Sequence, residues 1–239
     1  MASLKEVKGR IASVNSTRKI TSAMKMVASA KLHKAQAAIE SMLPYERRLH
    51  HILTDFMSNC TEVTSPFIVK REVKKVAVVV FASNTSLCGG FNANVIRHLV
   101  DLLAEYKPLG LENILVFPVG KKVADAVRKL GFRIEGDFQH MADKPSYQEA
   151  ADLTADLMKR FLHGDVDKVE LLYNHFKSTA SQILTRETYL PIDLNNEKKE
   201  EERTIDYILE PSAEELMQEM LPKVLRMKMF TVLLDSNAA

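Results

Sequence analysis

The chain has 239 residues, of which 46% are hydrophobic and 27% are charged, a composition typical of one large or two small globular domains. Its formal net charge of +2 is too small to predict nucleic-acid binding by the whole molecule. Two cysteines, Cys60 and Cys88, are too few for a disulfide framework. No apolar run approaches the ~18 residues that cross a bilayer, and the start, MASLKEVK, lacks a signal-peptide core. We therefore expect no direct membrane insertion.

The opening segment, residues 3–59, is predicted to be one long helix. Its only proline is Pro44, and no glycine follows Gly9, so almost nothing in it stops a helix. Alanine, lysine, methionine and leucine, which are strong helix formers, dominate Ala23–Leu43. At 1.5 Å per residue, the part before the proline would extend roughly 60 Å, about twice the width of a small domain. Such a helix must project from any compact core and pack against something else.

An apolar stripe on this helix follows the three–four spacing of a coiled-coil seam. The stripe has three parts in chain order: Leu4, Val7, Ile11 and Val14; then Ile20, Met24 and Val27; then Leu32, Ala35, Ile39 and Met42. The middle part is displaced, so the seam changes face midway, as a stutter would cause. No acidic residue lies between Glu6 and Glu40, whereas basic residues are frequent there: Lys8, Arg10, Arg18, Lys19, Lys25, Lys31 and Lys34. This pattern predicts a helix that faces another surface.

Beyond a polar linker at Asn59–Pro66, the pattern changes to alternating strands and helices. The predicted strands are Val76–Ala82, Asn113–Val119, Phe132–Phe138 and Lys168–Tyr173. The predicted helices are Asn94–Tyr106, Lys121–Leu130 and Ser146–Leu162. Gly131 is expected to cap the second of these helices, and Ser146 and Glu149 are expected to form a capping box at the third. The βαβαβαβ series predicts a mostly parallel, Rossmann-like α/β sheet with helices on both faces.

Two further strands, Ile183–Leu190 and Thr204–Leu209, are predicted around a solvated hairpin loop at Glu197–Arg203. From Ser212 the helical period returns, with a kink expected at Pro222. The two terminal helices are predicted to form an antiparallel coiled coil, with the α/β domain inserted between them. This divides the chain into an N-terminal shaft helix at 1–62, a globular foot at 63–211 and the start of a C-terminal shaft helix at 212–239.

Signals for an enzyme are weak. The pair Gly89–Gly90 lies between a strand and a helix, where α/β folds bind phosphates, but the G-x-G-x-x-G spacing is absent, and a tight turn is the simpler interpretation. Val119–Lys122 carries a lysine at a helix start but lacks the upstream glycine of a P-loop. The histidines are scattered, and Cys88 has no identifiable base. We therefore predict no catalytic residues, no cofactor and no metal site.

The run RIASVNSTRKITSAMKMVASAKLHKAQ resembles the N-terminal signature of the gamma subunit family of F-type ATP synthases. The family core K-I-T-x-A-M-x-M-V-A corresponds here to Lys19–Ala28. Leu87–Asn92 is similar to the family's L-C-G-G-x-N stretch, Asp206–Pro211 to its D-Y-x-x-E-P element, and Tyr189–Pro191 to its Y-L-P. The resemblance runs along nearly the whole chain. One departure is that the family's final helix continues past the equivalent of Ala239.

The resemblance implies a non-catalytic rotor subunit, the central stalk, which couples proton-driven rotation of a membrane ring to conformational change at catalytic beta subunits, and the reverse during ATP hydrolysis. The implied partners are the alpha, beta and epsilon subunits and the rotor ring, with no nucleic acid. The implied location is peripheral, on the cytoplasmic side of a bacterial inner membrane. The implied alpha and beta contacts are Arg10, Arg18, Lys19, Ile20, Met24, Lys25 and Val27. The implied epsilon and ring contacts are Gly89, Gly90, Phe91, Asn92, Tyr207 and Glu210.

The alternative from a different class is a standalone flavodoxin-like binding module whose basic helix docks on RNA or on anionic lipid. Nucleic-acid binding would weaken steeply with salt, whereas a buried coiled coil would hardly respond. If the seam is correct, Leu4, Val7, Ile11 and Val14 have no second strand to pair with. We expect that segment to be disordered or buried against another copy.

Overall fold

A five-stranded sheet lies at the centre of the fold, in the strand order β3-β2-β1-β4-β5. The computed structural model describes residues 3–59, 65–192 and 213–239. The strands are β1 (Val76–Phe81), β2 (Ile114–Val119), β3 (Arg133–Ile134), β4 (Lys168–Ser178) and β5 (Ser181–Leu190). The β1–β2, β1–β4 and β2–β3 pairs are parallel, and β5 is antiparallel to β4. The predicted, mostly parallel α/β sheet is confirmed.

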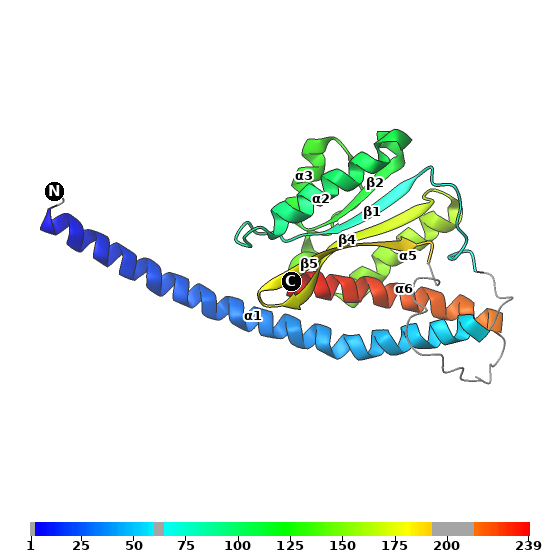
Figure 1. Cartoon of the computed structure of the whole chain (residues 1–239), viewed down its shortest axis with the longest axis horizontal. Helices are drawn as coiled ribbons and strands as arrows, with labels where there is room; N and C mark the ends of the chain where they lie inside the picture. Colours follow the sequence, from blue (N-terminus) through cyan, green and yellow to red (C-terminus); the bar gives the residue numbers. More distant parts are fainter. Residues whose placement is uncertain (1–2, 60–64, 193–212) are drawn as a thin grey trace.

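Helices cover both faces of this sheet, because β1 and β2 are apolar on both sides and are fully buried. One face packs on α2 (Phe91–Tyr106) and α3 (Lys121–Leu130). Two short 3₁₀ turns, at Lys107–Leu109 and Leu111–Asn113, connect α2 to β2. The other face packs on α4 (Gln139–Asp143), α5 (Tyr147–His163) and α6 (Ala213–Ala238) (Figure 1). The sheet is therefore the middle layer of three.

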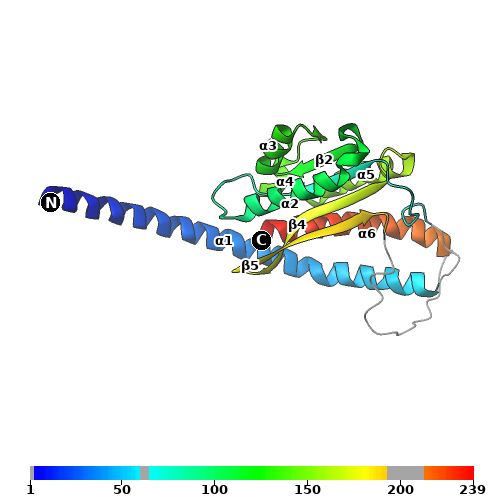
Figure 2. The same ribbon diagram turned by 45° about the horizontal axis from the view of Figure 1, so that its top comes forward.

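The longest element is α1 (Leu4–Asn59), which runs antiparallel to α6 and lies beside it on the side away from the sheet (Figures 1 and 2). At 1.5 Å per residue α1 is about 84 Å long and α6 about 39 Å, so the N-terminal half of α1 projects beyond the body. The paired part buries Ile39 of α1 against Leu234 and Ala238 of α6. Ala35 and Met42 border the same cluster, so the predicted coiled coil is confirmed in this register.

The projecting part of α1 does not behave as expected. Leu4, Val7, Ile11 and Val14 are 42% to 73% exposed, yet the helix is continuous from Leu4. Local interactions account for the order: the Glu6 N–H donates to Ser3 Oγ at 3.3 Å, and Arg10 pairs with Glu6 at 2.9 Å. The expectation of a disordered segment is wrong. The four residues have no seam partner within the described part of this chain.

The structure also corrects several predicted boundaries. The third strand is only two residues long, because the chain turns away at Gly136, whose φ is +74°. Helix α2 begins at Phe91 rather than Asn94, with Gly90 as its N-cap residue. Strands β4 and β5 are longer than predicted and form a hairpin that turns at Thr179 and Ala180.

Two predicted helix caps have different outcomes. Gly131 ends α3 in the left-handed conformation, with φ +76° and ψ +16°, as predicted. Ser146 does occupy the N-cap position of α5, but its side chain makes no capping hydrogen bond. Glu149 lies 3.3 Å from His140 instead, so the predicted capping box is wrong. The helix α6 continues through Pro222. The predicted loop at 197–203, the strand at 204–209 and most of the linker at 59–66 lie outside the described residues.

Substitution along α1 tests where the seam begins. We expect Ile39→Ala to lower the free energy of unfolding by about 2 kcal/mol, because this side chain is 6% exposed between the two helices. Val14→Ala, at a position that is 65% exposed, should change it by less than about 0.5 kcal/mol. Urea denaturation of the two variants measures both values. Equal losses of unfolding free energy would show that the packing of Ile39 against α6 does not stabilise the helix pair.

Candidate functional site

The residues of α1 that the resemblance selects are all exposed, which fits a contact surface rather than a core. They are Arg10, Arg18, Lys19, Ile20, Met24, Lys25 and Val27. Arg10 pairs with Glu6, but both side chains are at least half exposed, so this pair contributes little. Within the described ranges no ion pair engages Arg18, Lys19 or Lys25. Three cations are therefore available to an external partner.

These residues surround the helix. With 3.6 residues per turn, Ile20, Met24 and Val27 share one side, while Arg18 and Lys25 project from roughly the opposite side. Near the two cations, the hydroxyl of Thr17 donates to the carbonyl of Ser13 at 3.0 Å. The hydroxyl of Thr21 donates to the carbonyl of Thr17 at 2.9 Å. Residues 18–27 of α1 thus present an apolar stripe on one side and positive charge on the other. Nearer the N-terminus, Val14 lies on the same side as Arg18 and Lys25.

The loop after β1 is built around the side chain of Asn92, which is only 8% exposed. Asn92 Oδ1 accepts the N–H of Ser83 at 3.0 Å, and Nδ2 donates to the carbonyl of Thr85 at 2.8 Å and to Cys88 Sγ at 3.0 Å. These bonds fix both arms of the loop. Asn92 therefore supports the loop from inside instead of offering its side chain to a partner.

The loop's outer surface is formed by other residues. Leu87 is 85% exposed, Gly89 and Gly90 are exposed, and Phe91 is half-buried. Gly89 has φ +56°, which matches the predicted tight turn, whereas Gly90 has an ordinary φ of −80°. The remaining residues implied in epsilon and ring contacts, Tyr207 and Glu210, lie outside the described part of the chain.

In the turn Val119–Lys122, which was considered above as a possible phosphate-binding turn, a backbone N–H is already hydrogen-bonded to a protein side chain. Asn84 Oδ1 accepts the N–H of Lys121 at 2.7 Å. The Nδ2 of Asn84 donates at 2.8 Å to Gln139 O and to Asp143 Oδ2. Asn84 therefore ties the loop after β1 to the start of α3 and to α4, and this turn's function is structural.

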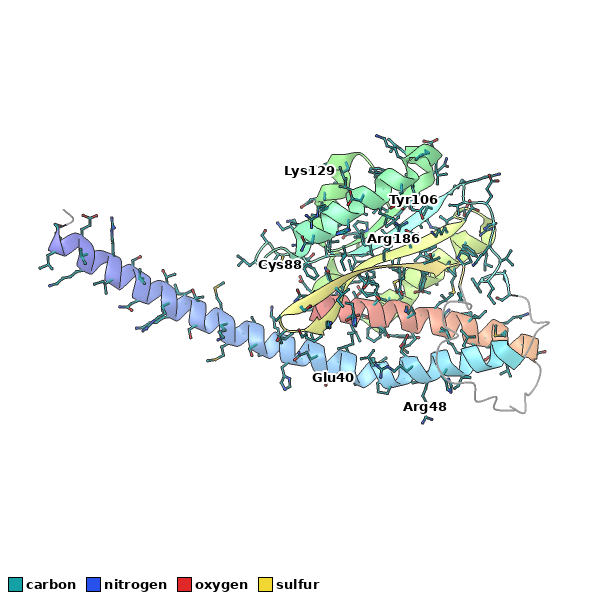
Figure 3. All side chains as sticks on the ribbon, viewed as in Figure 1. Glu40, Arg48, Cys88, Tyr106, Lys129 and Arg186 are labelled. Carbon is teal, nitrogen blue, oxygen red and sulfur yellow. The ribbon has the colours of Figure 1, made fainter. Side chains whose placement is uncertain are left out.

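The loop after β1 lies at the end of the body from which α1 projects, as the position of Cys88 shows (Figure 3). The β4–β5 turn and the last turn of α6 lie at this end too, whereas the last turn of α1 and the first turn of α6 lie at the opposite end (Figure 1). The sequence did not predict this placement, because it depends on the direction in which the rod crosses the sheet.

A buried carboxylate, which the sequence analysis did not single out, fixes β4 and β5 to the end of α2. Glu170 accepts from Arg186 Nε at 2.9 Å, from Lys168 Nζ at 2.5 Å and from Tyr106 OH at 2.8 Å. Arg186 also pairs with the exposed Glu105 at 2.7 Å. Burial alone would raise the pKa of Glu170, but the hydrogen bonds from Arg186, Lys168 and Tyr106 outweigh it and lower that pKa below its ordinary value.

A second unforeseen contact joins the β4–β5 hairpin to the end of α6. Asp235 accepts from the backbone N–H of Phe176 at 2.8 Å, and its other oxygen lies 2.7 Å from His175 Nδ1. The Phe176 ring packs against the cluster of Ile39, Leu234 and Ala238. The hairpin therefore contacts the junction of α1 and α6, at the position where α1 leaves the body.

Neither metal-site geometry nor a bilayer-spanning element is found in the part of the chain that the structure describes. No three His, Cys, Asp or Glu side chains are grouped there in a way that could hold a metal ion. None of the helices there combines the length and apolar character needed to span a membrane.

The chain combines a doubly wound α/β body with a long helix, α1, that pairs with α6 along the body and projects from it as a single exposed helix, an architecture typical of a stalk protein. The model of the ATP synthase family matches residues 3–239. Together with the relatives described next, this match shows that the chain belongs to the ATP synthase gamma chain family.

The relatives extend beyond the chain. The ATP synthase gamma chain of Phocaeicola vulgatus is 79% identical over the whole chain, which spans 83% of that protein. The gamma chain of Parabacteroides distasonis is 48% identical with the same coverage. Among solved structures, a chain from the central stalk and c-ring of the Tetrahymena thermophila mitochondrial ATP synthase aligns with a TM-score of 0.63. That alignment has 20% sequence identity and covers 92% of this chain and 93% of the other, which supports the fold.

Proposed function

We propose that the chain is the rotor of an ATP synthase, without a catalytic site of its own. It couples proton-driven rotation of a membrane ring to conformational change at the catalytic sites of neighbouring subunits, and the reverse during ATP hydrolysis. The observation that carries this proposal is the segment of α1 at residues 18–27, where the exposed apolar residues Ile20, Met24 and Val27 lie on the side of the helix opposite Arg18 and Lys25. A flat partner reaches one side of a helix, whereas an enclosing ring of subunits reaches all sides.

The difference between the two sides of α1 also supplies a mechanism. Equivalent sites around a ring become inequivalent only through different contacts with what lies inside the ring. A subunit facing Ile20 and Met24 meets an apolar surface, and one facing Arg18 and Lys25 meets positive charge. Turning the helix passes these contacts from one subunit to the next.

We propose alpha and beta subunits as the partners of Arg10, Arg18, Lys19, Ile20, Met24, Lys25 and Val27. Exposed ion pairs contribute only about 0.2–1 kcal/mol each, so acidic loops would steer the rotor without locking it. Met24, which is flexible and 53% exposed, can repack against successive neighbours. Small side chains such as Ala23 and Ala28 keep barriers to sliding low.

The position of the loop after β1 changes one assignment. The loop that contains Cys88 lies at the end from which α1 projects, so we propose that its residues Gly89, Gly90 and Phe91 face the alpha and beta subunits rather than the epsilon subunit and the membrane ring. The buried side chain of Asn92 holds this loop and makes no outside contact. Tyr207 and Glu210 remain proposed epsilon and ring contacts.

We also propose the division into shaft (1–62), foot (63–211) and returning shaft (212–239), with one qualification from the packing. Met217, Leu221, Leu225 and Met229 of α6 belong to the same buried cluster as the sheet. The helix α6 therefore belongs to both the shaft and the foot, and it would transmit torque between them. The proposed location is peripheral, on the cytoplasmic side of a bacterial inner membrane, where partner subunits hold the chain.

Neutralising the cations at the tip tests this function. We expect Arg18→Gln, Lys19→Gln and Lys25→Gln together to weaken binding to purified alpha and beta subunits about tenfold, because three exposed pairs add up to roughly 0.6–3 kcal/mol. Rotation-dependent ATPase activity of the reconstituted complex should fall in parallel. Pull-down titration and an ATPase assay measure the two effects.

The matched control carries the same charge change on exposed foot residues, as Lys107→Gln, Lys129→Gln and Lys159→Gln. It should bind and support ATPase activity like the unmodified chain. Equal loss in both triple variants would contradict a contact specific to the tip. The family assignment does not favour the alternative of a module that docks on RNA or lipid. Such a module would bind RNA or anionic lipid in the absence of alpha and beta subunits.

A further inference from the structure

The helix α1 is attached to the body most closely at two places. Among the side chains of α1 that the structure describes, only Ile39 and Leu53 are buried. Leu53 belongs to the core cluster of the sheet, together with Met217 of α6. Ile39 lies fourteen residues earlier, roughly 21 Å away at 1.5 Å per residue, in the smaller cluster with Leu234 and Ala238. The Ile39 cluster is therefore the last close attachment before α1 leaves the body.

At this attachment the two helices alone interlock weakly. Ala35 and Ala38 of α1, which border the Ile39 cluster, contribute only methyl groups to the packing. Helices pack by fitting ridges of side chains into grooves, and small side chains make shallow ridges. Two helices with shallow ridges can roll against each other at little cost. A third element in the same contact would hold α1 in one orientation.

The β4–β5 hairpin supplies this third element. The ring of Phe176 packs against the Ile39 cluster, so α1, α6 and β4 meet there. The register of β4 and β5 shifts between Phe176 and Ser178, and such irregularities re-aim side chains. Asp235 of α6 holds the hairpin with both carboxylate oxygens: Oδ1 accepts the N–H of Phe176 at 2.8 Å, and Oδ2 lies 2.7 Å from His175 Nδ1. Because hydrogen bonds to an ionised acceptor are strong, the hairpin is held at one position along α6.

We propose that Phe176, Asp235 and Ile39 form a clamp that fixes the orientation of α1 relative to the foot, so that the two turn together. Without the clamp, α1 would roll on α6 and take up part of each rotation before the foot followed. The role in turning rests on the proposed rotor function, whereas the fixed orientation is a property of the isolated chain. The two parts are therefore tested separately.

The orientation is tested on the isolated chain by double electron–electron resonance. Nitroxide labels are attached at two exposed positions, Lys31→Cys on α1 and Lys129→Cys on α3, in a chain whose Cys60 and Cys88 are replaced by serine. We expect Phe176→Ala to widen the distribution of distances between the labels about twofold, because it removes the ring that joins the three elements.

Three further variants make this test specific. Phe176→Leu keeps an apolar side chain in the cluster and should restore the narrow distribution. Asp235→Ala removes both contacts to the hairpin and should widen the distribution independently of Phe176. The matched control is Ile183→Ala, which truncates an exposed residue of the same hairpin outside the Ile39 cluster and should leave the distribution narrow. A narrow distribution in both Phe176→Ala and Asp235→Ala, or equal widening in Ile183→Ala, would overturn the clamp.

The role in turning is measured in vesicles that contain the chain and its proposed partner subunits. We expect the Phe176→Ala complex to hydrolyse ATP at the rate of the unmodified complex but to pump at least about twofold fewer protons per ATP, with recovery in Phe176→Leu. A merely structural defect would lower hydrolysis and pumping together. An unchanged ratio would overturn the role in turning. If the unmodified chain did not bind alpha and beta subunits, the rotor function itself would be contradicted, but the fixed orientation would not.

Discussion

Replacing Glu170 by alanine is expected to lower the free energy of unfolding by about 3–5 kcal/mol, because it leaves two cations beside an empty, buried site. Arg186 and Lys168 both bond to this carboxylate, whose side chain is 3% exposed. Chemical denaturation measures the loss. Glu105→Ala removes a 56% exposed partner of the same arginine and should cost less than about 1 kcal/mol. Similar losses in both variants would show that the burial of the carboxylate does not determine the loss of unfolding free energy.

The same residue predicts a response to acid. The pKa of Glu170 is lower in the folded chain than in the unfolded chain, so the unfolded state takes up its proton first as the pH falls. The stabilisation by Glu170 is complete above the ordinary glutamate pKa of about 4.3 and is lost as the pH falls through the lowered pKa. Glu170→Gln, whose side chain cannot titrate, should lack this component of acid unfolding.

Replacing Gly120 by alanine is expected to destabilise the chain by about 3 kcal/mol or more, enough to prevent soluble expression. A Cβ at this position would lie 2.1 Å from the backbone oxygen of Ala82, and φ is +114°, which side chains rarely adopt. The backbone of Ala82, directly after β1, cannot move aside without breaking the hydrogen bond from Ala82 N–H to Val119 O.

Gly131 provides the matched comparison, because its φ is +76° but a Cβ there would meet nothing within 4 Å. Gly131→Ala should cost only about 1–2 kcal/mol, the usual strain of a left-handed residue with a side chain. Melting temperature and soluble yield distinguish the two variants. If the Gly120→Ala variant were as stable as the Gly131→Ala variant, the chain after β1 and the chain after β2 would be able to move apart at little cost.

Most of the fold could be predicted because its signals are local. The apolar run at Val76–Phe81, the cap at Gly131 and the absence of helix breakers in α1 each depend on neighbouring residues. The β4–β5 turn at Thr179 and Ala180 carries no Asn-Gly or Asp-Gly signal, so the hairpin was not predicted. The two-residue β3 results from a single left-handed glycine within an otherwise strand-like run.

The candidate sites could be predicted less well. The cations on α1 are apparent in the sequence because no acidic residue lies between Glu6 and Glu40. The Glu170 cluster joins residues 16 and 64 positions apart, and only the folded sheet brings them together. The interior position of Asn92, and the end of the body at which its loop lies, likewise depend on tertiary structure rather than on a motif.

The contact between the β4–β5 hairpin and the junction of α1 and α6 has a mechanical consequence. Phe176 of the hairpin contacts Asp235 of α6 and packs against Ile39 of α1, next to the position where α1 leaves the body. The overhanging part, from about Ala35 to Leu4, is roughly 45 Å long at 1.5 Å per residue. Deflection of an overhanging beam under a side load grows with the cube of its free length. A grip this far forward therefore makes the overhang much stiffer than attachment at the far end of the body would.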